Sequence, residues 1–270
     1  MSTPPAPGFA SGVAVVFRMQ MRRLIRGKKL RLGVVSCGLV LFAVIMARYA
    51  SQREVGAERS AELAAEAINA GYGWGYFKLL VFLLPFLFLS SAIAEEVESR
   101  TFAFLTARPV GRVAITLGKY LAGTALALAL LLGTALVLHF AGYATEPTAM
   151  IDQLGNTGRT LLGLGLLTIC YCAICVFWGA IAPEAAGIVS ALYLAVIEFL
   201  VSYLPGYFRC ISMNFLARRI AGFEPGGLMP ELAPEVPMYV GAPIILSVTF
   251  LFLFFAAITV QMSEYRFSQA

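Results

Sequence analysis

Six long apolar runs divide this chain, and shorter polar segments separate them. The runs cover roughly residues 31–50, 77–94, 116–141, 159–182, 186–205 and 239–260. A helix that crosses the hydrocarbon core of a bilayer needs about 20 mostly apolar residues. The runs do not alternate between polar and apolar positions, as the strands of a membrane β-barrel do. Because backbone groups must be hydrogen-bonded inside lipid, the pattern predicts an all-α integral membrane protein with six transmembrane helices.

Residues 9–30, before the first run, have the pattern of an amphipathic helix. One face would hold Phe9, Val13, Val16, Phe17, Gln20 and Leu24, and another would hold Arg18, Arg22, Arg26 and Lys29. This pattern is typical of a helix that lies in the membrane interface with its apolar side toward the lipid. The alternative is a basic flank that fixes topology without forming a helix.

The remaining segments complete the predicted organisation. We expect a tail and interfacial helix at 1–30, a transmembrane domain at 31–260 and a cytoplasmic tail at 261–270. Within the domain, 51–76 would be an outer segment, 95–119 a cytoplasmic loop and 206–238 an outer loop. Residues 211–220 of that last loop could form a short interfacial helix. The aromatic residues of the stretch from Gly71 to Tyr76 are expected to lie at headgroup depth.

Composition and charge agree with a membrane location and indicate an orientation. Hydrophobic residues make up 60% of the chain and charged residues 13%, about half the usual share in soluble domains. A soluble enzyme, a disordered chain and a secreted disulfide scaffold are therefore excluded. A group of basic residues precedes the first span: Arg18, Arg22, Arg23, Arg26, Lys28, Lys29 and Arg31. Basic residues mark the cytoplasmic side, so both termini are predicted to be cytoplasmic. The net charge of +5 then suits anionic membrane lipid rather than nucleic acid.

The outer segment 51–76 carries acids at a regular spacing. Glu54, Glu58, Glu62 and Glu66 lie four residues apart, which places them on one helical face. A docking face for a basic or periplasmic partner is one interpretation. A solvated face, eased by Arg53 and Arg59, is the other.

Motifs for catalysis are missing from the sequence. The pair Gly118-Lys119 resembles part of a phosphate-binding loop, but Val113 and Tyr120 occupy positions where that motif needs Gly and Ser or Thr. His139 is the one histidine, and neither G-x-S-x-G nor H-E-x-x-H occurs. The chain is therefore predicted not to be an enzyme. Lys119 would be a basic anchor at the inner end of the third span, and His139 would lie at the interface or pack within the bundle.

Two features inside the predicted spans leave alternatives open. Cys172 and Cys175 have C-x-x-C spacing, which a soft metal could use, although cysteine also packs as a small apolar residue in such helices. Glu198 is the one acid in the middle of a predicted span. Such residues are costly and are candidates for function by default, while a structural hydrogen bond is the alternative.

The loop at 95–119 carries the strongest pattern. Acids stand at its start, Phe102, Phe104 and Leu105 form a short apolar stretch, and basic residues lead into the third span. Those aromatic side chains have no reason to be in a cytoplasmic loop unless they bury against the bilayer surface or a partner protein.

This loop resembles the signature of type-2 ATP-binding-cassette (ABC) permeases. The resemblance lies in three stretches, Glu95–Phe102, Leu105–Arg112 and Leu117–Tyr120. It extends to the whole chain through the elbow helix and the six spans. The chain is most similar to the single-domain bacterial branch, which includes permeases of copper-site maturation for nitrous oxide reductase and of gliding motility. One departure is Ser99-Arg100, where the family usually has a Gly before the Thr.

The resemblance implies a location, a partner and a set of contacts. A separate ABC ATPase, which binds ATP and Mg, would dock on the loop in the bacterial inner membrane. The contacting residues would be Glu95, Glu96, Phe102, Phe104, Leu105, Arg108, Pro109 and Arg112. Two copies of the chain and two ATPases would form the unit. Spans two and five usually line the dimer interface in this family, which would bring Glu198 near the pathway or that interface.

Two functions fit this resemblance. The first is a permease subunit that couples ATP hydrolysis by its partner to substrate export. The second is a subunit that transmits force to a periplasmic or envelope partner, at 51–76 or 206–238, without carrying a solute. A membrane scaffold that has no ATPase is a third and different class.

Overall fold

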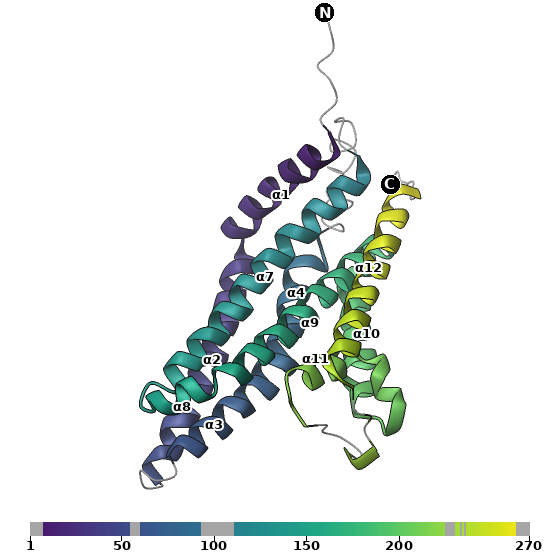
Figure 1. Cartoon of the computed structure of the whole chain (residues 1–270). Coiled ribbons are helices and arrows are strands. Elements are labelled where there is room, and N and C mark those ends of the chain that lie inside the picture. Colours follow the sequence, from purple (N-terminus) through teal and green to yellow (C-terminus); the bar gives the residue numbers. More distant parts are fainter. Residues whose placement is uncertain are drawn as a thin grey trace, which may run out of the picture.

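The computed structural model describes residues 8–54, 60–92, 111–224, 230–232, 234 and 236–262, and this part of the chain contains only helices and their connections. The long helices are α1 (Phe9–Arg26), α2 (Lys28–Glu54), α7 (Arg112–Gly142), α9 (Leu154–Ile181) and α12 (Met238–Met262). Shorter ones are α8 (Pro147–Asp152), η6 (Gly206–Ile211), α11 (Met213–Ile220) and η7 (Pro230–Leu232). Figure 1 shows α2, α7, α9 and α12 running along the long axis of the molecule.

The second and fifth crossings are built from several pieces. The second joins α3 (Ser60–Ala70), the π-helix η2 (Gly71–Leu80) and α4 (Val81–Leu89). The fifth joins η3 (Pro183–Ala185), α10 (Ala186–Tyr193), the π-helix η4 (Leu194–Leu200) and the 3-10 turn η5 (Val201–Tyr203). Six helices of the described chain are long and apolar enough to cross a membrane, which confirms the predicted fold class.

The second candidate span begins at Glu62 rather than near residue 77. The stretch from Gly71 to Tyr76 therefore lies inside a helix. Tyr72 and Tyr76 are buried, and the Tyr72 hydroxyl donates to the carbonyl of Ala135 at 3.0 Å. These two rings therefore pack against protein, and a neighbouring helix rather than water satisfies the Tyr72 hydroxyl; their depth in the membrane stays a prediction. Trp74 alone of the aromatic residues in this stretch is well exposed, at 68%.

The predicted amphipathic helix is confirmed as α1, but its buried face contacts protein. Gly12, Val16, Gln20 and Leu24 are buried at a spacing of four, and α1 packs along α7 (Figure 1). A Cβ added to Gly118 of α7 would lie 2.7 Å from Cβ of Val16, so the glycine permits the close approach. The apolar stripe that we expected to face lipid is therefore largely taken up by α7.

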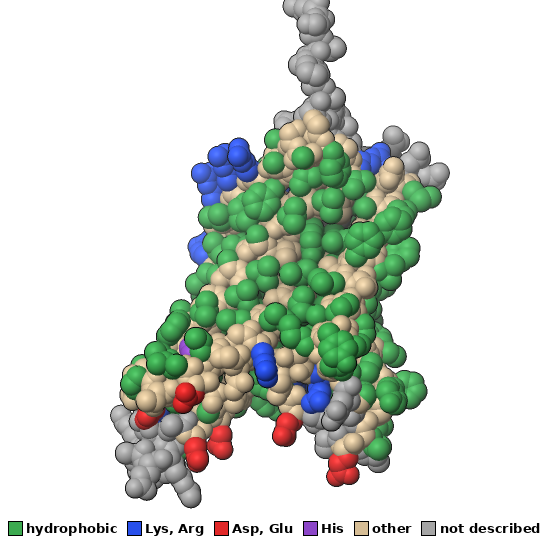
Figure 2. Space-filling model, viewed as in Figure 1, with side chains coloured by type: hydrophobic (Ala, Val, Ile, Leu, Met, Phe, Trp, Pro, Cys, Tyr) green, Lys and Arg blue, Asp and Glu red, His purple; other side chains and the backbone are tan. Residues whose placement is uncertain are grey.

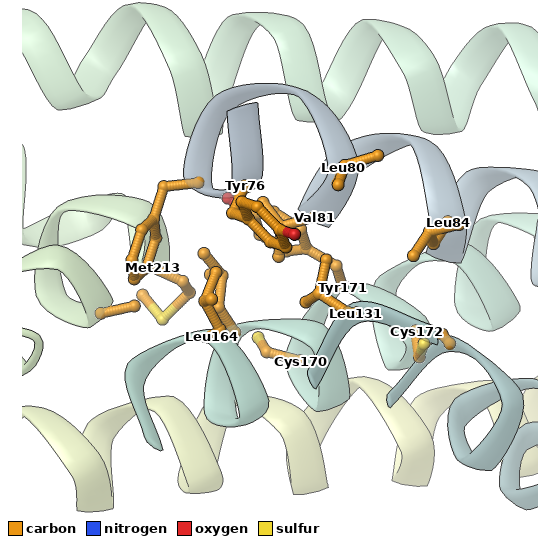
Figure 3. Close-up of a cluster of buried hydrophobic side chains, with 14 of the residues drawn as sticks. Tyr76, Leu80, Val81, Leu84, Leu131, Leu164, Cys170, Tyr171, Cys172 and Met213 are labelled. Carbon is orange, nitrogen blue, oxygen red and sulfur yellow. The ribbon is translucent and has the colours of Figure 1, made fainter. Parts of the chain in front are cut away.

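Helix α9 lies at the centre of the molecule and contacts α4, α7, α11 and α12. Its buried side chains meet those of the second span and of α11 in one cluster (Figure 3). Lipid gives helices no hydrophobic reason to associate, so small residues that allow tight packing matter most. The central helix accordingly carries Cys170, Cys172 and Cys175, all fully buried.

Helix α11 forms within the segment 211–220, as predicted, and it is buried in the bundle rather than lying on its surface. Met213, Leu216 and Ala217 are at most 5% exposed, and the helix packs against α9 and α12. A Cβ added to Gly163 of α9 would lie 2.6 Å from the carbonyl oxygen of Ala217. The chain therefore returns into the bundle after the fifth span, through a contact that glycine makes available.

Candidate functional site

Glu198 lies on η4 and is 1% exposed. One carboxylate oxygen, Oε2, accepts all three of its hydrogen bonds. The donors are the Tyr171 hydroxyl at 3.1 Å, the Ser212 hydroxyl at 3.2 Å and the backbone N–H of Asn214 at 3.1 Å. The other oxygen, Oε1, has no hydrogen-bond partner among the described residues. A buried carboxyl group thus joins the fourth span, the fifth span and the start of α11.

Two of the three donors, Ser212 and Asn214, lie at the start of α11 and help to fix where this helix begins. Ser212 is its N-cap, and the Ser212 hydroxyl accepts from the N–H of Phe215 at 3.4 Å. The one hydrogen of this hydroxyl is shared between Oε2 of Glu198 and the backbone carbonyl of Glu198, which lies at 2.8 Å. The first N–H groups of a helix have no partner within it, and negative charge is stabilised at this end. The Glu198 carboxyl therefore satisfies and fixes the N-terminus of α11.

Asn214 extends this network to the second span. Its side-chain amide donates to the carbonyl of Phe77 in η2 at 3.1 Å, while its backbone N–H bonds to Glu198 in η4. One residue of α11 therefore ties together the two π-helical segments. Short π-helical insertions are frequent at functional sites. Sequence reasoning found Glu198 but missed its partners, although Ser212 ahead of Met213 was a readable N-cap signal.

A groove lies on the surface between the second and fifth spans, and its volume is about 310 Å³. Its lining residues are Lys78, Leu79, Phe82, Leu83, Phe86, Ala191, Leu194, Ala195 and Phe199. Glu198 is not among them, because its side chain faces α9 and α11. Glu198 therefore does not line this groove, and the groove gives no support to the prediction that Glu198 lies on a pathway or at a dimer interface.

The end of the bundle that holds α1 also holds both edges of the predicted coupling loop. The described chain stops at Ala92 and resumes at Gly111. Lys119 donates to the carbonyl of Ala92 at 2.7 Å, and Lys29 donates to the Ser91 hydroxyl at 2.5 Å. Lys119 is 1% exposed, so the anchor that we expected at the inner end of the third span is a buried contact that joins α7 to the end of the second span.

Most of the predicted coupling residues lie outside the described chain: Glu95, Glu96, Phe102, Phe104, Leu105, Arg108 and Pro109. Arg112 is described, as the first residue of α7. Its guanidinium donates to the carbonyl of Gln261 at 3.2 Å, which connects the start of the third span to the end of the sixth.

His139 and the cysteines pack in the interior. The His139 ring is fully buried, with Nδ1 2.8 Å from the Thr157 hydroxyl and the Tyr143 ring 5.1 Å away. This confirms the packing interpretation of that histidine. The described residues include no group of three or more side chains that could hold a metal ion, and Cys172 and Cys175 lie in the core.

Two arginines, one near the end of α2 and one in η6, are also buried. Arg48 and Arg209 are both 0% exposed. Arg48 donates to the Thr145 hydroxyl at 3.4 Å, and Arg209 donates to the carbonyl of Leu204. Nothing in the local pattern distinguishes Arg48 from an exposed basic residue at the edge of a span, because its partner Thr145 is distant in sequence.

Comparison with known proteins places these features in a wider group. A family model described as ABC-2 family transporter protein matches residues 14–226. The matched range begins within α1 and runs past α11, so it includes the Glu198 network and both edges of the predicted coupling loop. No curated protein matches the chain.

Proposed function

The chain belongs to the ABC-2 family of transporter proteins, and from this premise we propose that a separate ABC ATPase drives it through the loop between the second and third spans. It is a permease subunit of an ABC transporter and a multi-pass protein of the bacterial inner membrane. The proposal adds two points, that a partner ATPase drives this subunit and that the direction of transport is export. ATP and Mg would bind to the ATPase, whose conformational cycle this chain would convert into movement of its helices.

The observation that carries the proposal is the construction of the α1 end of the bundle. Buried Lys119 holds the end of the second span, and Arg112 holds the end of the sixth. Helix α1 packs along the helix that both residues come from, α7. A push on residues 93–110 would therefore reach the second, third and sixth spans and the elbow helix together.

The charge distribution supports a cytoplasmic location for this end. In Figure 2, basic side chains lie around the end that holds α1 and also near the opposite end, whereas the acidic side chains in view lie only at that opposite end. Basic residues favour the cytoplasmic side of a membrane protein. We therefore place both termini and the coupling loop in the cytoplasm, where ATP is available.

The proposed assembly contains two copies of this chain and two ATPases, related by a twofold axis. This composition of the assembly is inferred from the resemblance of the coupling loop to that of the single-domain bacterial branch, which includes copper-maturation and gliding-motility permeases.

Charge and polarity reversals in the loop test the coupling. We expect Phe104→Asp and Arg108→Glu to abolish co-purification of the ATPase while the permease stays in the membrane. Arg22→Glu, on an exposed part of α1, is the matched control and should retain the ATPase. Normal co-purification and normal ATP turnover in both loop variants would refute the docking assignment.

One observation favours the force-transmitting function as a second candidate. The lining of the groove between the second and fifth spans has Lys78 as its one polar residue. A polar solute would need more polar groups along its path than this lining offers. Cross-linking from Glu62 or Glu66 of α3, both exposed, to an envelope protein in an ATP-dependent manner would support this candidate.

A further inference from the structure

A pocket of about 200 Å³ lies at the junction of α1 and α2, beside the end of the second span. Three of the side chains that line it are cationic, Arg23, Lys28 and Lys29, and none of its described lining residues is acidic. Gly27 alone joins α1 to α2, so the cations come from both helices of this bend. Figure 2 shows basic side chains beside α1 and near its junction with α2. The pocket therefore has a positive rim that suits an anionic group.

The ends of two spans set the level of this pocket. The first candidate span begins at Lys28, and the second ends at Leu89. Leu32 and Val35 follow Lys28 on the same face of α2, and they are 53% and 56% exposed. In a membrane these two apolar side chains would contact lipid, whereas basic residues favour the level of the headgroups. The change from Lys28 to Leu32 therefore follows the change from headgroup to acyl chain.

The inner wall of the pocket combines one polar side chain with apolar ones. Gln20 is 4% exposed, and its Oε1 has no hydrogen-bond partner among the described residues. Leu24 and Phe88 line the pocket with it, and both are at most 5% exposed. A buried acceptor without a donor is costly, so an occupant that carries a hydroxyl group would satisfy it. The wall and the rim together suit an amphiphile with an anionic, hydroxylated head.

This pocket and the groove between the second and fifth spans lie on opposite sides of the second span. Phe86 lines the groove, and Phe88 lines the pocket. Residues two apart on an α-helix lie about 200° apart around its axis. A second copy of the chain seated against the groove would therefore not occupy the pocket.

We propose that the pocket binds the headgroup of an anionic phospholipid, with the phosphate at Arg23, Lys28 and Lys29 and the acyl chains along the exposed face of α2. Phosphate oxygens accept charge-assisted hydrogen bonds from guanidinium and ammonium groups. A phosphate held by Arg23 of α1 and Lys28 of α2 would bridge the two helices across Gly27. The inference requires only that the chain lies in a membrane, so it stands or falls independently of ATPase coupling.

Photolabelling of the full chain in vesicles tests this site. The vesicles would contain phosphatidylcholine with a small share of phosphatidylglycerol, and either lipid would carry a photoreactive group close to its headgroup. We expect phosphatidylglycerol adducts concentrated on Leu24 and Phe88, well above those from the phosphatidylcholine probe. Mass spectrometry of the peptides locates the adducts. Phe250 of α12, which is 71% exposed, gives the level that lipid contact alone produces.

Lys28→Gln removes one cation from the rim without filling the pocket. We expect the preference for labelled phosphatidylglycerol over equally labelled phosphatidylcholine at this site to fall about fivefold, which corresponds to about 1 kcal/mol for one basic residue near anionic lipid. Arg18→Gln removes the same charge from an exposed position of α1 outside the lining, so it should keep the preference. An unchanged preference in Lys28→Gln, or an equal fall in both variants, would overturn the assignment of the phosphate to this rim.

Three other results would overturn the site itself. One is labelling of the pocket no stronger than labelling of Phe250. Another is adducts that form only when Glu95→Gln and Glu96→Gln are combined, because acids of the chain itself would then be the occupant. The third is loss of the pocket adducts in inorganic phosphate but not in chloride of equal ionic strength, which would indicate a site for a soluble anion. ATPase co-purification measured on the same samples reports separately on coupling.

Discussion

Glu198 uses one oxygen to hold the beginning of a helix, which gives this buried acid a structural reason to exist. Its three donors come from Tyr171, Ser212 and Asn214. Removal of the acceptor would leave the donors of Tyr171 and Asn214 buried and unsatisfied, and each unsatisfied group costs about 1–3 kcal/mol, while the Ser212 hydroxyl keeps the backbone carbonyl at position 198. The charge and the acceptor can be tested separately, because a glutamine keeps an acceptor oxygen in the same place.

We expect Glu198→Ala to lower the melting temperature of the purified protein by at least about 5 °C, because its cost of a few kcal/mol would shift a domain of this size by that much. Glu198→Gln should melt close to the parent. Thermal unfolding in detergent measures both. If the alanine variant is as stable as the parent, the network does not hold α11. If the glutamine variant is stable and couples ATP hydrolysis at the parent rate, the charge has no functional role.

At the scale of elements, contact between α9 and α11 depends on one glycine. Gly163→Ala would place a methyl group 2.6 Å from a backbone oxygen that cannot rotate away. We expect a loss of about 1–3 kcal/mol, as in other overpacked cores. Gly165→Ala in the same helix meets nothing within 4 Å, so it should be neutral or stabilising by up to about 1 kcal/mol. Equal melting temperatures for the two variants would contradict the close approach.

The sequence predicts elements better than it predicts how they meet. Long apolar runs specify spans by length alone, and the alternation of Val16, Gln20 and Leu24 with basic residues specifies α1. The partner of that apolar stripe could not be read, because α7 and lipid are equally apolar. The burial of α11 was missed because its basic residues suggest a surface, while the carboxyl group that satisfies its first turn lies on another element.

The interior position of Glu198 could be predicted, but its role could not. An acid inside a span indicates a cost that something must offset. Which groups offset it depends on Tyr171 and Asn214, which only the packed bundle brings to it. The sequence did not predict that the second span extends back to Glu62. Gly71, Gly73 and Gly75 are typical of a loop, but they lie in a π-helix.

At the scale of the whole molecule, the proposed orientation predicts from which side of the membrane a reagent can reach Cys210. This cysteine is half-buried in η6, beyond the end of the fifth span, whereas the other cysteines are buried. In intact spheroplasts, a membrane-impermeant maleimide should label Cys210 from outside, and Cys210→Ser should abolish the label. Labelling only in inside-out vesicles would reverse the proposed topology.

The pH dependence of that labelling has a definite sign. Burial raises the pKa of the Cys210 thiol above its ordinary value. Thiolate is the reactive form, so at neutral pH this residue should react more slowly than an exposed cysteine. The difference in reaction rate between Cys210 and an exposed cysteine should become smaller as the pH rises through the raised pKa. Equal rates for Cys210 and for a cysteine introduced at exposed Tyr207 across this range would show that burial has no effect.

The two π-helical segments determine how a span would turn if its helix geometry changed. A π turn holds more residues than an α turn, so a change from one to the other rotates everything beyond it about the helix axis. The segments η2 and η4 lie on neighbouring spans, and Asn214 joins them across α11. A twist entering one span at the α1 end would therefore reach the other as a twist too. The second and fifth spans would then rotate together about their own axes rather than bend at a hinge.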